Sequence, residues 1–169
     1  MPLVTFDALP ANSAITFGSP PWQLPEGEFW AAPFFWGNGQ ATTGGFARID
    51  SQGYAHGSNN EAGLSNVNVC FRALPYTPSI SLVEFAFGEY GGNLNLMVNG
   101  QLVNFGNFQD IHQQVIGGVT VDVLFGGGGQ DYGKIVLLGN MSEQYYGANL
   151  WGHLAIGGQE LWIDDLRWQ

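Results

Sequence analysis

Basic residues are scarce in this sequence. Four Lys and Arg stand against fourteen Asp and Glu, which gives a formal net charge of −10. Proteins hold phosphate backbones mainly through Lys and Arg, whose contacts release counterions from the nucleic acid. So few basic residues argue against nucleic-acid binding, and the same charge disfavours anionic membranes and acidic polysaccharides. A neutral ligand or a cation is the partner that this electrostatic field leaves open.

Cysteine and long apolar stretches are scarce as well. The single cysteine, Cys70, can form neither an internal disulfide framework nor a zinc cluster. It lies in the alternating segment 67–72, which predicts a small apolar side chain on a strand. No stretch approaches the roughly 20 apolar residues of a membrane helix, so membrane insertion is not expected. No leader peptide is visible before 3–7, and we expect a secreted protein whose leader has been removed.

Motifs of nucleophilic, zinc and phosphate chemistry are missing too. The sequence has no Gly-x-Ser-x-Gly turn, and the three histidines, His56, His112 and His153, lack zinc-binding spacing. The glycine run at 126–129 is not followed by the Lys-Ser/Thr of a phosphate-binding loop. No reaction class is therefore indicated by a motif.

Short alternating apolar runs fill most of the chain. Segments 67–71, 94–98 and 119–125 place apolar residues on one face and polar residues on the other, which is typical of half-buried strands. Asn99-Gly100 predicts a tight hairpin, and a glycine-rich tip at 126–133 predicts a second one. Further strands are predicted at 3–7, 14–17, 28–36, 46–50, 80–87, 150–156 and 160–168.

This spacing predicts an all-β fold with little or no helix. About ten strands at such intervals suit a two-sheet antiparallel sandwich of the jelly-roll type. The segment with the best helical pattern is a turn near 107–114. Neither an internal repeat nor a linker is visible, so we expect a single domain over residues 1–169.

Aromatic residues are the clearest indication of function, with 6 Trp, 6 Tyr and 12 Phe. Sugars present apolar C–H faces that stack on aromatic rings, while their hydroxyls bind amides and carboxylates. The alternative is that these rings form the core, where aromatic side chains are common. The candidate ligand-binding residues combine clustered rings with polar neighbours: Trp30, Trp36, Asn38, Glu89, Tyr90, Asn93, Tyr146 and Trp151.

The glycine-rich segment 88–93 is a candidate binding loop. It lies between two predicted strands, and its glycines permit positive φ and a close approach of the backbone to a ligand. We expect this freedom to let Glu89, Tyr90 and Asn93 point at one ligand. The alternative is a simple connection with a solvated Glu89.

Two adjacent aspartates in the closing strand suggest a cation site. Alternation places Asp164 and Asp165 on opposite faces, so one of them points to the apolar side or to the rim of the strand. Carboxylate oxygens suit calcium, and Asp7 supplies another ligand if the terminal strands are neighbours. The alternative is an ion pair with Arg167 or Arg48.

Two terminal motifs resemble secreted bacterial jelly-roll domains. They are the opening Val4-Thr5-Phe6-Asp7-Ala8-Leu9-Pro10 and the closing segment 158–166, and segment 85–96 is similar to the central strands of the same group. Many of these proteins are extracellular and carry a C-terminal sorting signal of the Pro-Glu-Pro type. The resemblance implies a fold similar to β-sandwich carbohydrate-binding modules. It also implies a structural calcium bound by an aspartate that corresponds to Asp164 or Asp165.

These observations leave three functions open. We favour a non-catalytic, lectin-like module that binds a neutral polysaccharide or oligosaccharide outside the cell. The second is a small polysaccharide hydrolase or lyase, with Glu89 as acid/base assisted by Tyr90 or His153. A hydrolase needs two carboxylates about 5 to 10 Å apart, and the sequence does not pair them. The third is a matrix or adhesion subunit.

Overall fold

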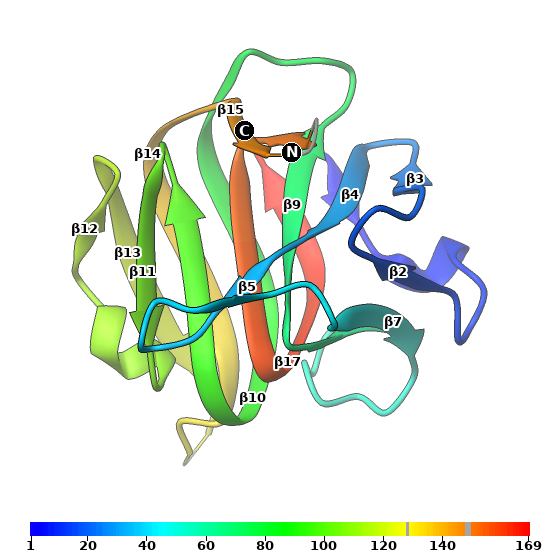
Figure 1. Cartoon of the computed structure of the whole chain (residues 1–169), viewed down its shortest axis with the longest axis horizontal. Coiled ribbons are helices and arrows are strands. Elements are labelled where there is room, and N and C mark those ends of the chain that lie inside the picture. The colour runs from blue at the N-terminus through cyan, green and yellow to red at the C-terminus, as the bar shows by residue number, and fades with distance from the viewer. Residues whose placement is uncertain (128, 148–149) are drawn as a thin grey trace.

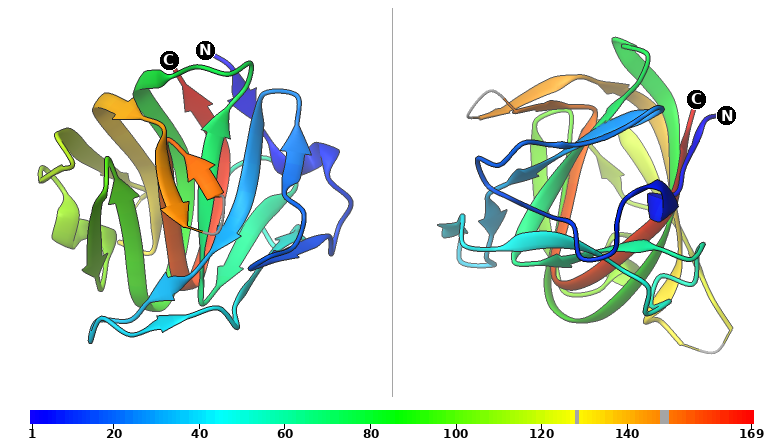
Figure 2. Two further views of the ribbon diagram at one scale, coloured as in Figure 1. Left: turned by 45° about the horizontal axis from the view of Figure 1, so that its top comes forward. Right: turned by 90° about the vertical axis from the view of Figure 1, so that its right-hand side faces the viewer.

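Antiparallel strands make up nearly all of the regular secondary structure (Figure 1). The computed structural model describes residues 1–127, 129–147 and 150–169. The strands form two layers that face each other, joined along one side where strands bend from one layer into the other (Figure 2). The predicted all-β, two-sheet antiparallel sandwich is confirmed.

The strands are numbered in chain order. Their bounds are β1 (Leu3–Val4), β2 (Ala14–Thr16), β3 (Trp22–Leu24), β4 (Gly27–Ala32), β5 (Phe34–Phe35), β6 (Ala41–Thr42), β7 (Phe46–Asp50), β8 (Glu61–Ser65), β9 (Val67–Ala73), β10 (Ser79–Val98), β11 (Gln101–Phe105), β12 (Val115–Ile116), β13 (Val119–Phe125), β14 (Tyr132–Ser142), β15 (Gln144–Gly147), β16 (Leu150–Gly152) and β17 (Leu154–Trp168).

Two long strands, β10 and β17, run through both layers. The first half of β10 pairs with β14 and with the second half of β17, and its second half pairs with β11 and the first half of β17. One layer is therefore β12-β13-β14-β10-β17-β8-β7-β2, and the other is β11-β10-β17-β9-β4-β3. The predicted strands 80–87 and 94–98 are thus the two halves of β10.

The strands turn between the layers at a corner. In β10 the pairing slips at Gly91 and Gly92, whose φ angles are +141° and +82°. Asn66, at φ +51°, makes the turn from β8 to β9. In β17, a Cβ at Gly157 would lie 2.2 Å from the Val67 carbonyl oxygen, so only glycine fits there. The corner brings the backbones of β8, β10 and β17 together.

Side chains between the layers form the core. In β13, Val119, Val121 and Val123 are buried while Thr120 and Asp122 are half-buried, as the alternation predicts. The largest fully buried side chains are phenylalanines, and each contributes about 1.5–3 kcal/mol through burial. They are Phe6, Phe29, Phe34, Phe71, Phe85, Phe87 and Phe108.

Cys70 is fully buried in β9, as predicted for a small apolar strand residue. Burial raises the pKa of its thiol to about 12. The thiol therefore stays protonated and unreactive at neutral pH.

The predicted turns are present. Asn99-Gly100 joins β10 to β11 with φ angles of +47° and +79°, as a two-residue hairpin requires. Strands β13 and β14 form the second hairpin, in whose tip Gly128 lies outside the described residues. The segment 107–114 contains a 3₁₀ turn, η2 (Phe108–Ile111). Among the described residues, no helix has the length and apolar character to cross a membrane.

Candidate functional site

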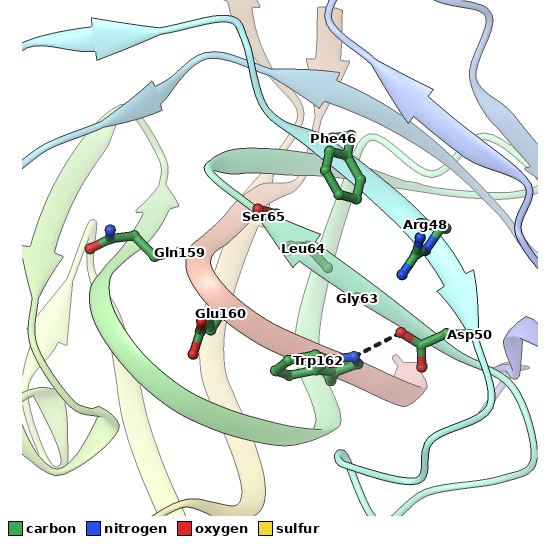
Figure 3. Close-up of a pocket in the computed structure, with 9 residues that line it drawn as sticks. All are labelled: Phe46, Arg48, Asp50, Gly63, Leu64, Ser65, Gln159, Glu160 and Trp162. Carbon is green, nitrogen blue, oxygen red and sulfur yellow. Dashed lines mark hydrogen bonds between the residues drawn. The ribbon is translucent and has the colours of Figure 1, made fainter.

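A groove lies on the outer face of the first layer (Figure 3). One row of paired residues crosses this face, from Arg48 on β7 over Gly63 on β8 to Trp162 on β17. A Cβ at Gly63 would lie 2.8 Å from Trp162 Nε1 and 2.9 Å from Asp50 Oδ2. Because Gly63 has no side chain, the indole of Trp162 can lie over β8 and form the floor of the groove.

The groove has an aromatic part and a polar part. The aromatic part has a volume of about 160 Å³ and adjoins a polar hollow of about 350 Å³ at the corner. We call the two together the corner groove. Ser65, Gln159 and Glu160 line both parts. The other lining residues are Phe46, Arg48, Asp50, Gly63, Leu64 and Trp162 in the aromatic part, and Asn66, Gly91 and Gly92 in the polar part.

Trp162 is held in place by a hydrogen bond and by two tyrosine rings. Its Nε1 donates to Asp50 Oδ2 at 2.9 Å. Its ring centroid lies 4.6 Å from that of Tyr54 and 5.5 Å from that of Tyr90, and the two tyrosine rings are 4.8 Å apart. Tyr54 is 37% exposed and Tyr90 is 42% exposed. We call Tyr54, Tyr90 and Trp162 the aromatic wall.

Tyr54 reaches the wall because loop 51–60 crosses the outer face above β10. Gly88, the neighbour of Trp162 on β10, leaves the space that this loop needs. A Cβ there would lie only 2.0 Å from the Tyr54 carbonyl oxygen. A glycine on each side of Trp162, at 63 and at 88, thus makes room for the indole and for the loop.

Two buried carboxylates hold loop 51–60 on the sheet. Glu61 accepts hydrogen bonds from the backbone N–H groups of Tyr54, at 2.9 Å, and Ala55, at 2.6 Å. Asp164 accepts from the backbone N–H and the hydroxyl of Ser58. Burial raises the pKa of both carboxyl groups, and the neighbouring Asp50 raises that of Glu61 further. The conformation of Tyr54 therefore depends on groups buried behind the groove.

The polar part of the corner groove offers hydrogen-bonding groups. Gln159 Oε1 accepts from the backbone N–H of Asn93 at 2.6 Å and from Asn93 Nδ2 at 3.2 Å. Asn66 Oδ1 is buried and has no hydrogen-bond partner among the described residues. In the aromatic part, the Arg48 guanidinium lies 5.9 Å from the centre of the Phe46 ring. The groove thus combines donors and acceptors with an aromatic floor.

Only part of the predicted binding loop belongs to this groove. Tyr90 is in the aromatic wall. Asn93 does not line the groove, but its backbone N–H donates to Gln159, which does. Glu89 is buried instead, where it accepts from the Phe108 N–H at 3.2 Å and from Asn107 Nδ2. The expectation that these side chains point at one ligand is corrected, because 88–93 belongs to strand β10 and neighbouring side chains leave opposite faces.

Trp30, Trp36 and Asn38 lie away from the groove. Trp30 is half-buried on β4 in the other layer, with the Arg72 guanidinium 4.6 Å above its ring. Trp36 and Asn38 belong to the β5–β6 hairpin. There the Trp36 N–H donates to the Gln40 carbonyl at 2.8 Å, and Asn38 Nδ2 donates to Gln40 Oε1 at 3.1 Å. Local polar groups thus hold this hairpin in shape.

Tyr146 and Trp151 lie on the β15–β16 hairpin, which packs on the outer face of the other layer. Tyr146 packs on the small cluster that contains Cys70, and burial raises the pKa of its phenol. Trp151 is 45% exposed, and its ring centroid lies 5.2 Å from that of Tyr145. These residues form an aromatic surface separate from the corner groove.

The residues of the enzyme alternative, Glu89 and His153, both have backbone partners. His153 is fully buried, its Nδ1 accepts from the Ala73 N–H at 3.3 Å, and its Nε2 lies 2.7 Å from the Thr77 carbonyl oxygen. Burial lowers the pKa of His153, which favours the neutral ring. Burial, together with the nearby Asp131 and Asp110, raises the pKa of Glu89 to about 7. Neither residue lines the corner groove.

The aspartates predicted to bind calcium have separate partners. The terminal strands are neighbours as predicted, with Val4 opposite Leu166. Asp7 accepts from the Asn60 N–H at 2.7 Å, while Asp164 lies under loop 51–60 and Asp165 sits in a bulge at φ +49°. In the part of the chain that the structure describes, His, Cys, Asp and Glu form no group of three or more placed to hold a metal. The calcium ion stays a prediction.

The sequence analysis did not predict most of the residues that line the groove. Phe46, Asp50 and Trp162 come from three strands and meet only through long-range pairing. The alternation in 46–50 was the available signal, since it places Phe46, Arg48 and Asp50 on one face. No local pattern reveals that Gly63 and Gly88 leave the space beside Trp162.

Comparison of the chain with protein-family models, with curated proteins and with solved structures found no match. The resemblance to secreted jelly-roll domains therefore stays a prediction.

Proposed function

We propose that this domain binds a non-anionic glycan, in the simplest case a neutral polysaccharide or oligosaccharide, in the corner groove and without catalysis. The observation that carries the proposal is an open groove with a half-exposed indole as its floor and with amides and carboxylates around it. The C–H face of a sugar ring stacks on such a floor, and its hydroxyls bind the polar rim.

The fixed position of Trp162 supports this proposal. The bond to Asp50 and the contacts with Tyr54 and Tyr90 hold the indole before any ligand arrives. A ring that is already ordered loses little conformational entropy on binding. We expect modest affinity from so open a site, with dissociation constants of roughly micromolar to millimolar.

The compartment belongs to the same proposal. An insoluble polysaccharide lies outside the cell, so we propose that the protein is secreted. Detection of the protein in culture medium tests this, and retention of the native protein inside the cell contradicts it.

Removal of the groove tryptophan tests the function directly. We expect wild-type protein to be pulled down by at least one of cellulose, xylan, mannan, chitin and chitosan. Trp162→Ala should lose at least about tenfold in affinity, because about 1.4 kcal/mol of stacking contact disappears. Trp151→Ala is the matched control, since it removes an exposed tryptophan outside the groove and should bind like wild type.

Folding is checked independently of binding. Melting curves show whether Trp162→Ala keeps its structure, and Tyr90→Ala removes a more exposed ring of the same wall. If none of the polysaccharides binds wild-type protein, the proposal is wrong. Loss of binding in Trp151→Ala, with Trp162→Ala and Tyr90→Ala unaffected, would place the site elsewhere.

A further inference from the structure

We infer that the corner groove prefers a glycan whose sugar rings carry free amino groups over the same glycan without charge. This inference rests on the proposed function and names the substrate class of the same site. It follows from the two carboxylates of the groove and from the side of Trp162 on which each lies.

Asp50 and Glu160 lie on either side of the Trp162 ring (Figure 3). Asp50 is partly used by the protein, because Oδ2 accepts from Trp162 Nε1 and Oδ1 accepts from the Gln52 N–H at 3.3 Å. Glu160 is exposed, and its carboxylate takes no hydrogen bond or ion pair from residues 1–127, 129–147 or 150–169. Glu160 is therefore the carboxylate that is available to a ligand.

The backbone beside Glu160 leaves its carboxylate open to the groove. Its partner on β10 is Gly91, which has no side chain to cover it. A Cβ at Gly91 would lie 3.9 Å from Glu160 Oε2, so the space above this glycine is next to the carboxylate. A ring stacked on Trp162 extends toward this space, where its substituents meet Glu160.

The charge of the groove favours a cationic substituent at this end. Arg48 is the one basic residue in the lining, and it lies on the other side of Trp162 from Glu160 (Figure 3). Two carboxylates against one guanidinium leave the groove negative, and the chain as a whole carries −10. An ammonium group beside Glu160 forms an ion pair with the carboxylate and is attracted by the aromatic face, whereas a hydroxyl or an acetamide gains only a hydrogen bond to the carboxylate.

Three oligosaccharides with one backbone provide the test. Oligomers of chitosan, chitin and cellulose share a β-linked chain and differ at a single substituent, which is an amine, an acetamide or a hydroxyl. Titration calorimetry at about pH 5.5, where the sugar amines are protonated, compares their affinities for wild-type protein. We expect the chitosan oligomer to bind about tenfold more tightly than the cellulose oligomer. Salt at about 0.5 M should reduce the preference to less than about threefold, because it screens charges.

A charge-removing variant assigns the preference to one side chain. Glu160→Gln keeps the size of the side chain but removes its charge, so it should weaken binding of the chitosan oligomer more than binding of the cellulose oligomer. We expect the ratio of the two affinities to fall from about tenfold to less than about threefold. Glu26→Gln is the matched control, because it removes a carboxylate outside the groove lining and should keep the preference.

The outcomes separate this inference from the proposed function. If the three oligomers bind alike, if an uncharged oligomer binds most tightly, or if Glu160→Gln keeps the preference, the inference is overturned and the proposed function stands. If no oligosaccharide or polysaccharide binds, both are overturned. Binding of an oligolysine peptide in the groove, in place of every glycan, also overturns both, since it identifies a peptide as the ligand.

Discussion

The two outer faces of the sandwich are built from the same long strands but are covered differently. On the second layer, the β5–β6 and β15–β16 hairpins lie over the sheet (Figures 1 and 2). There the buried Asn95 bonds both the N–H and the carbonyl of Phe35, and Tyr146 packs on the Cys70 cluster. On the first layer, loop 51–60 covers only part of the sheet and leaves Trp162 half-exposed.

This difference shows why aromatic content alone does not locate a binding site. Trp30 and Trp36 belong to the part of the chain with the most clustered rings, yet each has contacts within its own layer. Trp162 has no aromatic residue beside it in the sequence, and it forms the floor of the groove because its neighbours on the adjacent strands are glycines. A ligand can reach only those rings that the hairpins and loop 51–60 leave exposed on the outer faces.

The largest expected loss of stability comes from a substitution that displaces loop 51–60 from the outer face of the first layer. Gly88→Ala places a Cβ where the Tyr54 carbonyl oxygen now lies, at 2.0 Å, so loop 51–60 must move. We expect a loss of about 4 kcal/mol of unfolding free energy, together with loss of glycan binding. Denaturant unfolding and the pull-down measure the two effects. Gly44→Ala is the control, since its Cβ would meet only Thr42 Oγ1 at an ordinary 3.7 Å. Equal stability of the two variants would contradict the close packing of this loop.

A smaller change in stability should come from the ionisation of Glu89, which is buried on the interior side of β10. The pKa of Glu89 is raised by burial from 4.5 to about 7. A raised pKa means that its contribution to stability is complete below about pH 4.5 and is lost as pH rises through about 7. At about 1.4 kcal/mol per pKa unit, this loss amounts to roughly 3–4 kcal/mol. Burial also raises the pKa of Glu61 and of Asp164, so these two carboxyl groups likewise contribute less to stability as pH rises.

Unfolding curves between about pH 4 and pH 8 measure this dependence. We expect Glu89→Gln to flatten it, and Glu160→Gln, which changes an exposed carboxylate, to leave it unchanged. If Glu89→Gln has the same pH dependence as the wild-type protein, Glu89 is not buried as described.

The smallest effect should come from the second layer, and it should leave binding intact. Asn95→Ala removes the side chain that bonds the Phe35 N–H and carbonyl and that accepts from Asn68 Nδ2. We expect a loss of about 2 kcal/mol, because the Phe35 N–H loses its partner and the Phe35 carbonyl keeps only the bond from Asn104 Nδ2. Glycan affinity should not change. A loss of affinity in a variant that is still folded would show that the two faces are not independent.

The fold was largely predictable from local sequence. The alternation of apolar and polar residues located most strands, and Asn99-Gly100 located a hairpin. The sequence around Cys70 predicted a small apolar strand residue, and the structure buries it fully. The continuity of β10 was not predictable, because Gly91 and Gly92 are typical of a loop as much as of a bent strand. Local sequence does not record whether the two flanking segments stay paired with β17 across the bend.

The groove was much less predictable. Tyr90 was among the predicted ligand residues and lies in the aromatic wall, whereas Glu89 beside it faces the interior. Asp50 and Trp162 are far apart in sequence and come together only through the pairing of β7, β8 and β17. Such pairings depend on the whole fold, so no short motif contains them.

The bend of β17 has a mechanical consequence. The corner groove lies at the middle of this strand, and the second half of β17 leads from the groove to the C-terminus, where β1 pairs with it (Figure 1). A pull between a ligand in the groove and the chain ends is directed along β17, parallel to its neighbours. Its backbone hydrogen bonds with β10 are then loaded in shear and resist together, whereas an edge strand would peel away bond by bond.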